Sequence, residues 1–289
     1  MFLTIFTPTY NRAYCLGNLY DSLVGQEDKD FEWVIVDDGS SDETDALVKS
    51  WIGENRIDIR YFKQPNAGKH SAINRGVKAA CGDFFFIVDS DDRLAGDAVR
   101  NIKVFAMQIA DRDDFAGVSG LRIHSDTTKI SQGINRSVID GTSLDFRYRY
   151  NIKGDLAEVF KTKVMRRYPF PEFKHERFVP EALVWNRIAH DGLKLRLFDK
   201  GIYICEYLAD GLTAGIIRVR MNSPIASTTY YAELIQLDIP YTSKIKAAIN
   251  YWRFYRRNTS GIKRISVRWM WLRPMGYLFH LLDLRQNKK

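Results

Sequence analysis

The sequence predicts an α/β fold with a mainly parallel sheet flanked by helices, followed by a C-terminal helical extension. Three observations predict it. Over the first hundred residues, short apolar runs alternate with segments whose apolar residues recur at helical spacing. Polar clusters follow these apolar runs directly. Beyond Pro224 the pattern is helical and aromatic, without glycine-rich linkers or internal repeats.

Four apolar runs predict the first strands, at residues 2–6, 31–36, 57–62 and 84–88. Helices are predicted after them, at residues 16–24, 40–51, 72–80 and 98–109. Asn11 is placed as the N-cap of the first helix, and Ser40 with Glu43 has the spacing of a capping box for the second. Strands joined by helices pair in parallel, so ligands are expected beyond their carboxyl ends.

The middle of the chain is less regular. Residues 115–123 predict a strand, and residues 202–207 predict a last one. Between them, Pro180 fits the first turn of a helix that ends near His190.

The positive charge of the chain lies in its tail. The net charge of +8 divides into +11 for residues 241–289, where twelve Lys and Arg face one acid, and −3 for residues 1–240. We expect one α/β domain over residues 1–220 and a basic helical extension over residues 221–289. A negatively charged partner is expected at the extension, while the acidic balance elsewhere argues against nucleic acid as the main partner.

Cysteine content and hydropathy exclude several classes of protein. The three cysteines are far apart and form no CxxC pair, which argues against a disulfide framework or a zinc site. The N-terminus has no signal-peptide pattern, and no stretch reaches the roughly 20 apolar residues of a spanning helix. We expect a cytoplasmic protein, peripheral on the cytoplasmic membrane face if its tail binds lipid.

An aspartate cluster follows the fourth predicted strand. Alternation along an extended chain points Asp89 and Asp91 to the same side, where two carboxylates can share one cation, and Asp92 adds a third. Hard oxygen ligands favour Mg²⁺ or Mn²⁺, which keep positions open for waters and a diphosphate. The alternative is a solvated acidic turn that caps the next helix.

Two further polar groups are expected at the same edge. Asp37 and Asp38 end the second strand, where a carboxylate can accept hydrogen bonds from a base N–H or ribose hydroxyls. Asn66, Gly68 and Lys69 form a turn whose backbone can pass close to a ligand, with a cation for phosphate. The alternatives are helix capping for the first group and an ordinary turn for the second.

These motifs resemble those of family 2 glycosyltransferases of GT-A fold, a Rossmann-like sheet architecture. The resemblance covers about the first ninety residues and rests on Thr7-Pro8-Thr9-Tyr10-Asn11-Arg12, Val36-Asp37-Asp38-Gly39-Ser40-Ser41-Asp42, Asn66-x-Gly68, Asn74-x-Gly76, Ala80-x-Gly82-Asp83, and the DxD-like Asp89-Ser90-Asp91-Asp92. It implies an inverting transfer of a sugar from a nucleotide-sugar, usually a UDP-sugar, to a carbohydrate or lipid-linked hydroxyl acceptor in polysaccharide or glycolipid assembly.

The same resemblance implies roles for individual residues. Pro8, Thr9 and Asp38 would line the uridine pocket, with Asp37 nearby. Asp89 would lie near the ribose and the metal, and Asp91 would be the principal metal ligand. The metal would neutralise charge on the departing diphosphate.

An inverting transfer also needs a base for the acceptor hydroxyl. Family members usually supply it from a Glu-Asp pair that opens a helix and is followed by an aromatic residue and Arg. Here Trp185 and Arg187 fit, the Asp is absent, and Glu181 takes its place when the stretch is aligned on Trp185. We expect Glu181 as the base, with Glu176 in reserve; the alternative is that Glu181 only favours the helix dipole.

The tail interleaves aromatic residues and cations, at residues 251–257 and 269–273. This composition suits the interface of an anionic membrane, and the alternative is a helical pair packed on the catalytic domain. Other functions kept open are a nucleotide-sugar hydrolase, a nucleotidyltransferase, which lacks its Gly-rich, Lys-containing loop here, and a basic-tailed module that binds nucleic acid or membrane.

Overall fold

The computed structural model describes residues 1–132, 134, 136–206, 215–256 and 259–286. The chain forms two compact units. The first comprises residues 1–169 and 191–207, and the second comprises residues 170–190 and 208–289. The predicted boundary of the catalytic domain near residue 220 stays a prediction.

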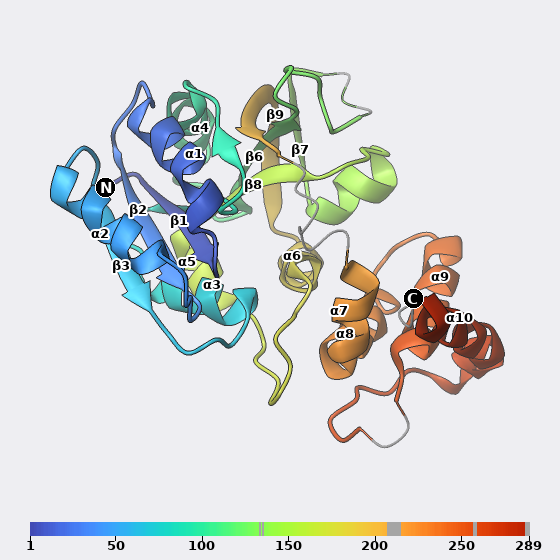
Figure 1. Ribbon diagram of the computed structural model, residues 1–289. Coiled ribbons are helices and arrows are strands. Elements are labelled where there is room, and N and C mark those ends of the chain that lie inside the picture. The colour runs from blue at the N-terminus through green and yellow to red at the C-terminus, as the bar shows by residue number, and fades with distance from the viewer. Residues whose placement is uncertain (133, 135, 207–214, 257–258, 287–289) are drawn as a thin grey trace. The chain divides into compact units, whose positions relative to one another are not determined.

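The first unit is built on a mixed sheet (Figure 1). Its described strands are β1 (Leu3–Thr9), β2 (Phe31–Asp37), β3 (Ile59–Lys63), β4 (Phe84–Ile87), β5 (Arg93–Leu94), β6 (Phe115–Ile123), β7 (Val138–Gly141), β8 (Leu156–Lys161) and β9 (Lys194–Ile204). They are ordered β3-β2-β1-β4-β8-β6-β9-β5, and β7 also pairs with β9. Strands β1 to β4 are parallel, whereas β8 runs antiparallel to both β4 and β6.

Helices cover both faces of this sheet. They are α1 (Ala13–Val24), α2 (Thr44–Glu54), α3 (Lys69–Ala79), α4 (Ala98–Met107) and α5 (Thr162–Arg167), with a π-helical turn η1 (Asp145–Arg149). Helices α1, α2 and α4 share one hydrophobic core with the sheet, while α3 contacts β1 and β2 on the other face, next to α5. The predicted α/β class with helices flanking a central sheet is confirmed; the sheet is parallel over β1 to β4 and mixed beyond them.

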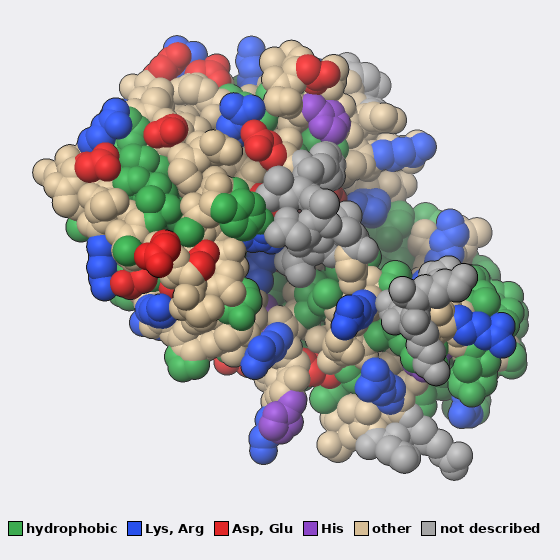
Figure 2. All heavy atoms as spheres, in the orientation of Figure 1, with side chains coloured by type: hydrophobic (Ala, Val, Ile, Leu, Met, Phe, Trp, Pro, Cys, Tyr) green, Lys and Arg blue, Asp and Glu red, His purple; other side chains and the backbone are tan. Residues whose placement is uncertain are grey.

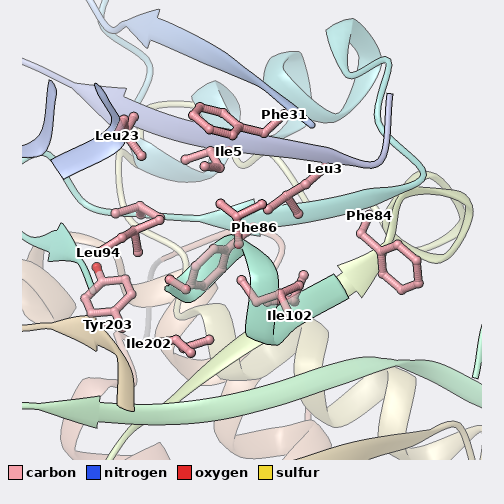
Figure 3. Close-up of a cluster of buried hydrophobic side chains, with 14 of the residues drawn as sticks. Leu3, Ile5, Leu23, Phe31, Phe84, Phe86, Leu94, Ile102, Ile202 and Tyr203 are labelled. Atoms are coloured by element: carbon pink, nitrogen blue, oxygen red, sulfur yellow. The ribbon is translucent and has the colours of Figure 1, made fainter. Parts of the chain in front are cut away.

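Alternation along β1 divides its side chains between the two faces. Leu3 and Ile5 are fully buried in the core with α1 and α4, where Phe86 and Tyr203 join them (Figure 3). Phe6 lies on the opposite face against α3. An added Cβ at Gly76 of α3 would come within 2.2 Å of the Phe6 ring. Glycine is therefore required at position 76 by the close approach of α3 to β1.

The predicted helix caps are wrong. Helix α1 begins after Arg12 rather than at an Asn11 cap, and Asn11 has a left-handed φ of 53°. The carboxamide oxygen of Asn11 instead accepts the Ser41 N–H at 2.8 Å. The Ser40 hydroxyl accepts the Asn11 N–H at 2.9 Å and makes no cap bond to α2. Bonds between the two loops have replaced local capping.

Asp42, in the loop after β2, accepts hydrogen bonds from the first residues of both α1 and α2. The carboxylate of Asp42 accepts the Ala13 N–H of α1 at 3.0 Å and the Thr44 N–H of α2 at 3.1 Å. A single carboxylate therefore holds the carboxyl-end loops of β1 and β2 together.

The irregular middle of the chain contributes structure that spacing did not predict. Strands β7 and β8 and helix α5 lie there, while the predicted strand at residues 115–123 is confirmed as β6. The predicted last strand is confirmed only in part, because β9 spans Lys194–Ile204. Residue 207 lies outside the described residues.

The second unit is helical in its described part. Its helices are α6 (Glu181–His190), α7 (Ile216–Asn222), α8 (Pro224–Leu234), α9 (Tyr241–Phe254), the 3₁₀ helix η2 (Val267–Leu272) and α10 (Arg273–Gln286). Helix α8 packs against α6, α7 and α9, and α9 packs against α10. Among the described residues, the length and hydropathy needed to cross a membrane are found together in none of these helices.

Gly76→Ala should destabilise the first unit, because a Cβ at this position overlaps the Phe6 ring. We expect a loss of roughly 1–3 kcal/mol in the free energy of unfolding, measured in urea. Gly17→Ala in α1 is the control, since no described atom outside its helix lies within 4 Å of the added Cβ. That substitution should be neutral or stabilise by up to about 1 kcal/mol, and equal losses for both would contradict the packing explanation.

Candidate functional site

Three loops meet at the carboxyl edge of the parallel strands. The register of β1 and β2 places Thr9 beside Asp37, and the Asp38 N–H donates to the Thr9 carbonyl at 2.8 Å. On the other side of β1, the Val88 N–H donates to the Phe6 carbonyl at 2.8 Å and continues the pairing with β4. The loops after β1, β2 and β4 therefore begin side by side, as predicted for a ligand edge.

Asp38 shapes the turn that leads into α3. Its carboxylate accepts the Gln64 side-chain N–H at 2.8 Å, the Ala67 N–H at 2.9 Å and the Gly68 N–H at 2.7 Å. Gly68 has a φ of 96°, a conformation that glycine adopts without strain. Asn66 lies half-buried in the same turn. The predicted residues Asp38, Asn66 and Gly68 are thus brought together.

Asp37 is fully buried and bonded on both carboxylate oxygens. It accepts the Ser40 N–H at 2.7 Å and the Tyr61 hydroxyl at 2.6 Å. Burial raises the pKa of Tyr61 well above its ordinary value, and the bond to Asp37 adds to the rise. Asp37 therefore supports the end of β2 from within.

Thr9 offers an unused polar group at this edge. Its side chain is 3% exposed, and its hydroxyl has no hydrogen-bond partner among the described residues. Pro8 beside it is half-buried and contributes no N–H. Buried hydroxyls are nearly always hydrogen-bonded, so the Thr9 hydroxyl keeps an unused hydrogen-bonding capacity next to the end of β1.

Asp89 forms an ion pair with Lys69, the first residue of α3. The Lys69 ammonium lies 2.5 Å from the Asp89 carboxylate. Burial disfavours the charged form of Asp89, but the positive charges of Lys69 and Arg122 outweigh it, so the pKa of Asp89 lies below its ordinary value. The structure thus brings together the predicted phosphate cation and the first residue of the DxD motif.

Asp91 is half-buried and repelled by its neighbour. Burial raises its pKa, and the negative charge of Asp89 raises it further. Carboxylate oxygens are the hard ligands that Mg²⁺ and Mn²⁺ prefer. The donor set at Asp89 and Asp91 therefore suits a hard divalent metal.

Asp92 has a different environment. It is 7% exposed and accepts the Tyr203 hydroxyl at 2.6 Å and the Glu206 N–H at 2.9 Å. Burial raises its pKa to about 6, although the bond from Tyr203 opposes the rise. Within the described ranges, the structure has no group of three or more His, Cys, Asp or Glu side chains placed to hold a metal. A cation here would thus need oxygens from a ligand or water.

Tyr203 and Arg122 belong to the site, although the sequence did not indicate them. The Tyr203 hydroxyl accepts the Asp89 N–H at 3.0 Å and donates to Asp92, so it fastens both ends of the aspartate loop. The Arg122 guanidinium carbon lies 4.3 Å from the centre of the Tyr203 ring. The sequence did offer one signal for Arg122, because it is a cation inside the otherwise apolar strand β6.

The two predicted base candidates lie in the second unit. Glu181 is the first residue of α6 and is half-buried. Glu176 accepts the Ile225 N–H at 2.7 Å and the Ala226 N–H at 2.8 Å, so its two oxygens cap the start of α8. Glu176 therefore has a structural role, and Glu181 stays the predicted base.

Comparison with known proteins gives sequence relatives and structural neighbours. Over 189 residues, or 63% of this chain, the sequence is 28% identical to GalNAc(5)-diNAcBac-PP-undecaprenol beta-1,3-glucosyltransferase of Campylobacter jejuni. The match spans 58% of that relative. Over 34% of this chain it is 37% identical to chondroitin synthase of Pasteurella multocida, covering 10% of that protein.

Two solved structures share the fold. S. aureus TarS 1–349 in complex with UDP-GlcNAc has a TM-score of 0.64 at 17% identity, over 96% of this chain and 79% of that one. The mannosyltransferase PcManGT from Pyrobaculum calidifontis, in complex with GDP-Man and Mn²⁺, has a TM-score of 0.58 at 18% identity, over 96% and 73%.

At the level of families, the match is to Glycosyl transferase family 2 and extends over residues 4–172. Since this match covers more than half of the chain, the chain belongs to glycosyl transferase family 2.

Proposed function

We propose that this chain is an inverting glycosyltransferase that moves a sugar from a UDP-sugar to a hydroxyl acceptor, with a divalent metal at the aspartate loop. The observation that carries the proposal is the buried, unpartnered Thr9 hydroxyl at the same sheet edge as the repelling pair Asp89 and Asp91. The Thr9 hydroxyl can accept or donate a neutral hydrogen bond, as a base or ribose requires. The carboxylates of Asp89 and Asp91 are the hard oxygen ligands that the metal of a metal–diphosphate prefers.

The nucleotide would lie along the edge formed by the β1 and β2 loops. Thr9 would bond the base or ribose, with Pro8 packing beside it. Asp38 would act by holding the 64–68 turn against that edge, and Asp37 by bracing the end of β2. Asn66 and Gly68 would present backbone to the donor, and Lys69 would meet its phosphates.

Asp91 would be the principal metal ligand and Asp89 the second, with Asp92 positioned behind them by Tyr203. When bound, Mn²⁺ or Mg²⁺ would neutralise the charge that develops on the leaving diphosphate. The Mn²⁺ complex of the mannosyltransferase neighbour supports this assignment. The UDP-GlcNAc complex of TarS supports a uridine donor, while the GDP-Man complex makes guanosine the alternative to test.

Glu181 would take the proton of the acceptor hydroxyl as that oxygen attacks the sugar. Glu181 is the acidic residue in the first turn of α6. We assign the transfer chemistry to residues 1–220 and treat residues 221–289 as an extension.

The acceptor is proposed to be lipid-linked or a growing polysaccharide. The Campylobacter relative is named for an undecaprenol-linked acceptor, and the Pasteurella relative for chondroitin synthesis. A lipid-linked acceptor would lie at a membrane, so peripheral association on its cytoplasmic face is part of the proposal. The rival is a nucleotide-sugar hydrolase, which would release UDP equally fast without any acceptor.

UDP together with Mn²⁺ should protect the chain against unfolding, and a chelator should remove the protection. At a hundredfold excess over Kd the gain is about 2.7 kcal/mol, which differential scanning fluorimetry detects. Asp91→Asn should abolish the metal-dependent part. Asp58→Asn, at an exposed aspartate after α2, should retain it. The metal assignment would be refuted if UDP protected the chain equally with and without metal and in Asp91→Asn. Stronger protection by GDP than by UDP would show that the donor carries guanosine instead of uridine.

Glu181→Gln should lower kcat about 10²–10⁴-fold, because the variant cannot accept the acceptor proton. Protection by UDP and Mn²⁺ should stay unchanged, which separates donor binding from proton transfer. Turnover is measured as UDP release with and without acceptor. Glu176→Gln is the comparison: it should cost about 0.5–2 kcal/mol of stability through the α8 cap and leave kcat near wild type. Wild-type turnover in Glu181→Gln would rule Glu181 out.

Tyr203→Phe should raise the Mn²⁺ concentration for half-maximal activity roughly tenfold, because the aspartate loop loses its shared hydroxyl. Excess metal should restore most of the rate. Tyr20→Phe is a matched control, since this buried hydroxyl donates to Glu54 at 2.7 Å, away from the aspartate loop. If both variants lose stability alone and keep the wild-type metal midpoint, Tyr203 only supports the fold.

A further inference from the structure

Helix α10 packs on α9 through Gly276 and Asp283, which are both buried. An added Cβ at Gly276 would lie 2.4 Å from the Trp252 Cβ, which shows how closely the two helices approach. Asp283 is 5% exposed and accepts two hydrogen bonds from the Arg253 guanidinium, both at 2.6 Å. The α9–α10 contact is therefore made by a glycine and a buried ion pair.

Exposed apolar side chains cover much of the rest of α10. Met275, Leu278 and Leu282 follow each other at spacings of three and four and are 47%, 56% and 42% exposed. Trp271, at the end of η2, is 63% exposed. We call these four residues the α10 apolar surface. A surface helix of a water-soluble protein normally turns its polar side to solvent, so the polarity of α10 is reversed.

Exposed cations flank these four residues in the sequence. Arg264, Arg268, Arg273 and Arg285 are all exposed. Asp283 is the single acid between residues 241 and 289, and Arg253 already neutralises it. Figure 2 shows hydrophobic side chains over the part of the molecule that holds α10, with Lys and Arg side chains among them. The surface thus combines exposed hydrophobic area with uncompensated positive charge.

We propose that the α10 apolar surface docks on an anionic lipid bilayer, with α10 lying in the interfacial plane. Leu and Met side chains would enter the acyl boundary, Trp271 would sit at headgroup depth, and the arginines would meet lipid phosphates. Charge complementarity favours this occupant over a second copy of the chain. A two-fold contact through α10 would bring the same arginines of both copies together.

This inference adds a partner surface to the proposed lipid-linked acceptor but does not depend on it. Vesicle binding is measured with the full chain in the absence of donor and acceptor. A failure of binding would therefore leave the UDP and Mn²⁺ protection untouched, and a failure of that protection would leave the binding result intact.

The test is co-sedimentation with vesicles of phosphatidylcholine alone or with added phosphatidylglycerol. Wild type should sediment with the anionic vesicles and be released by salt. Leu278→Asp combined with Leu282→Asp should weaken the binding about tenfold or more, with the unfolding midpoint retained because both sites are exposed. The control combines Val104→Asp with Met107→Asp on α4, which are 53% and 63% exposed and carry the same charge change. The control should bind like wild type.

A second pair of variants keeps the test decisive if the aspartates unfold the second unit. Arg264→Glu with Arg268→Glu leaves the apolar surface in place and should abolish the preference for anionic vesicles. The proposal is overturned if wild type does not sediment with anionic vesicles, or if both pairs bind as wild type does. It is also overturned if sedimentation equilibrium shows a dimer that the Leu278 and Leu282 substitutions dissociate without any change in vesicle binding.

Discussion

The parallel pairing of β1 with β2 on one side and β4 on the other is the constraint on which the site depends. It aligns the carboxyl ends of three strands, so the loops after Thr9, Asp37 and Ile87 begin at one edge. The same pairing sets the faces of β1, because Ile5 faces the core with α1 and α4 while Phe6 faces α3. Close contact at Gly76 then places the start of α3, and with it Lys69, beside Asp89.

The acids of the motifs at this edge do not all have the same role. Asp38 and Asp92 are bonded to backbone N–H groups and neighbouring side chains, and their work is to hold a turn and a loop. What stays open is the group without a partner, Thr9, and the group under repulsion, Asp91. Buried carboxylates satisfied by several donors are rigid supports, and such rigidity is what a preorganised binding site requires.

Local pattern predicted the local structure well. The strands at residues 31–36 and 84–88 and the helix that ends at His190 match the structure within about two residues, because apolar spacing directly reports the buried face. The caps could not be predicted in this way, since Asp42 serves two helices across a loop contact. Tyr203 was equally hidden: it lies 114 residues from Asp89, and no local spacing encodes their hydrogen bond.

The structure of the tail was also beyond what local sequence pattern predicts. Composition indicated an anionic partner for residues 241–289, but aromatic and basic content does not say which side of a helix faces solvent. The orientation of α10 depends on two residues. Gly276 allows the close approach to α9, and the charge of Asp283 is neutralised by Arg253 of α9. Once these two residues occupy the contact, helical periodicity turns Met275, Leu278 and Leu282 outward. The exposed apolar side of α10 is thus a consequence of how the helix pair is joined, and a purely structural pairing would have placed the leucines inside.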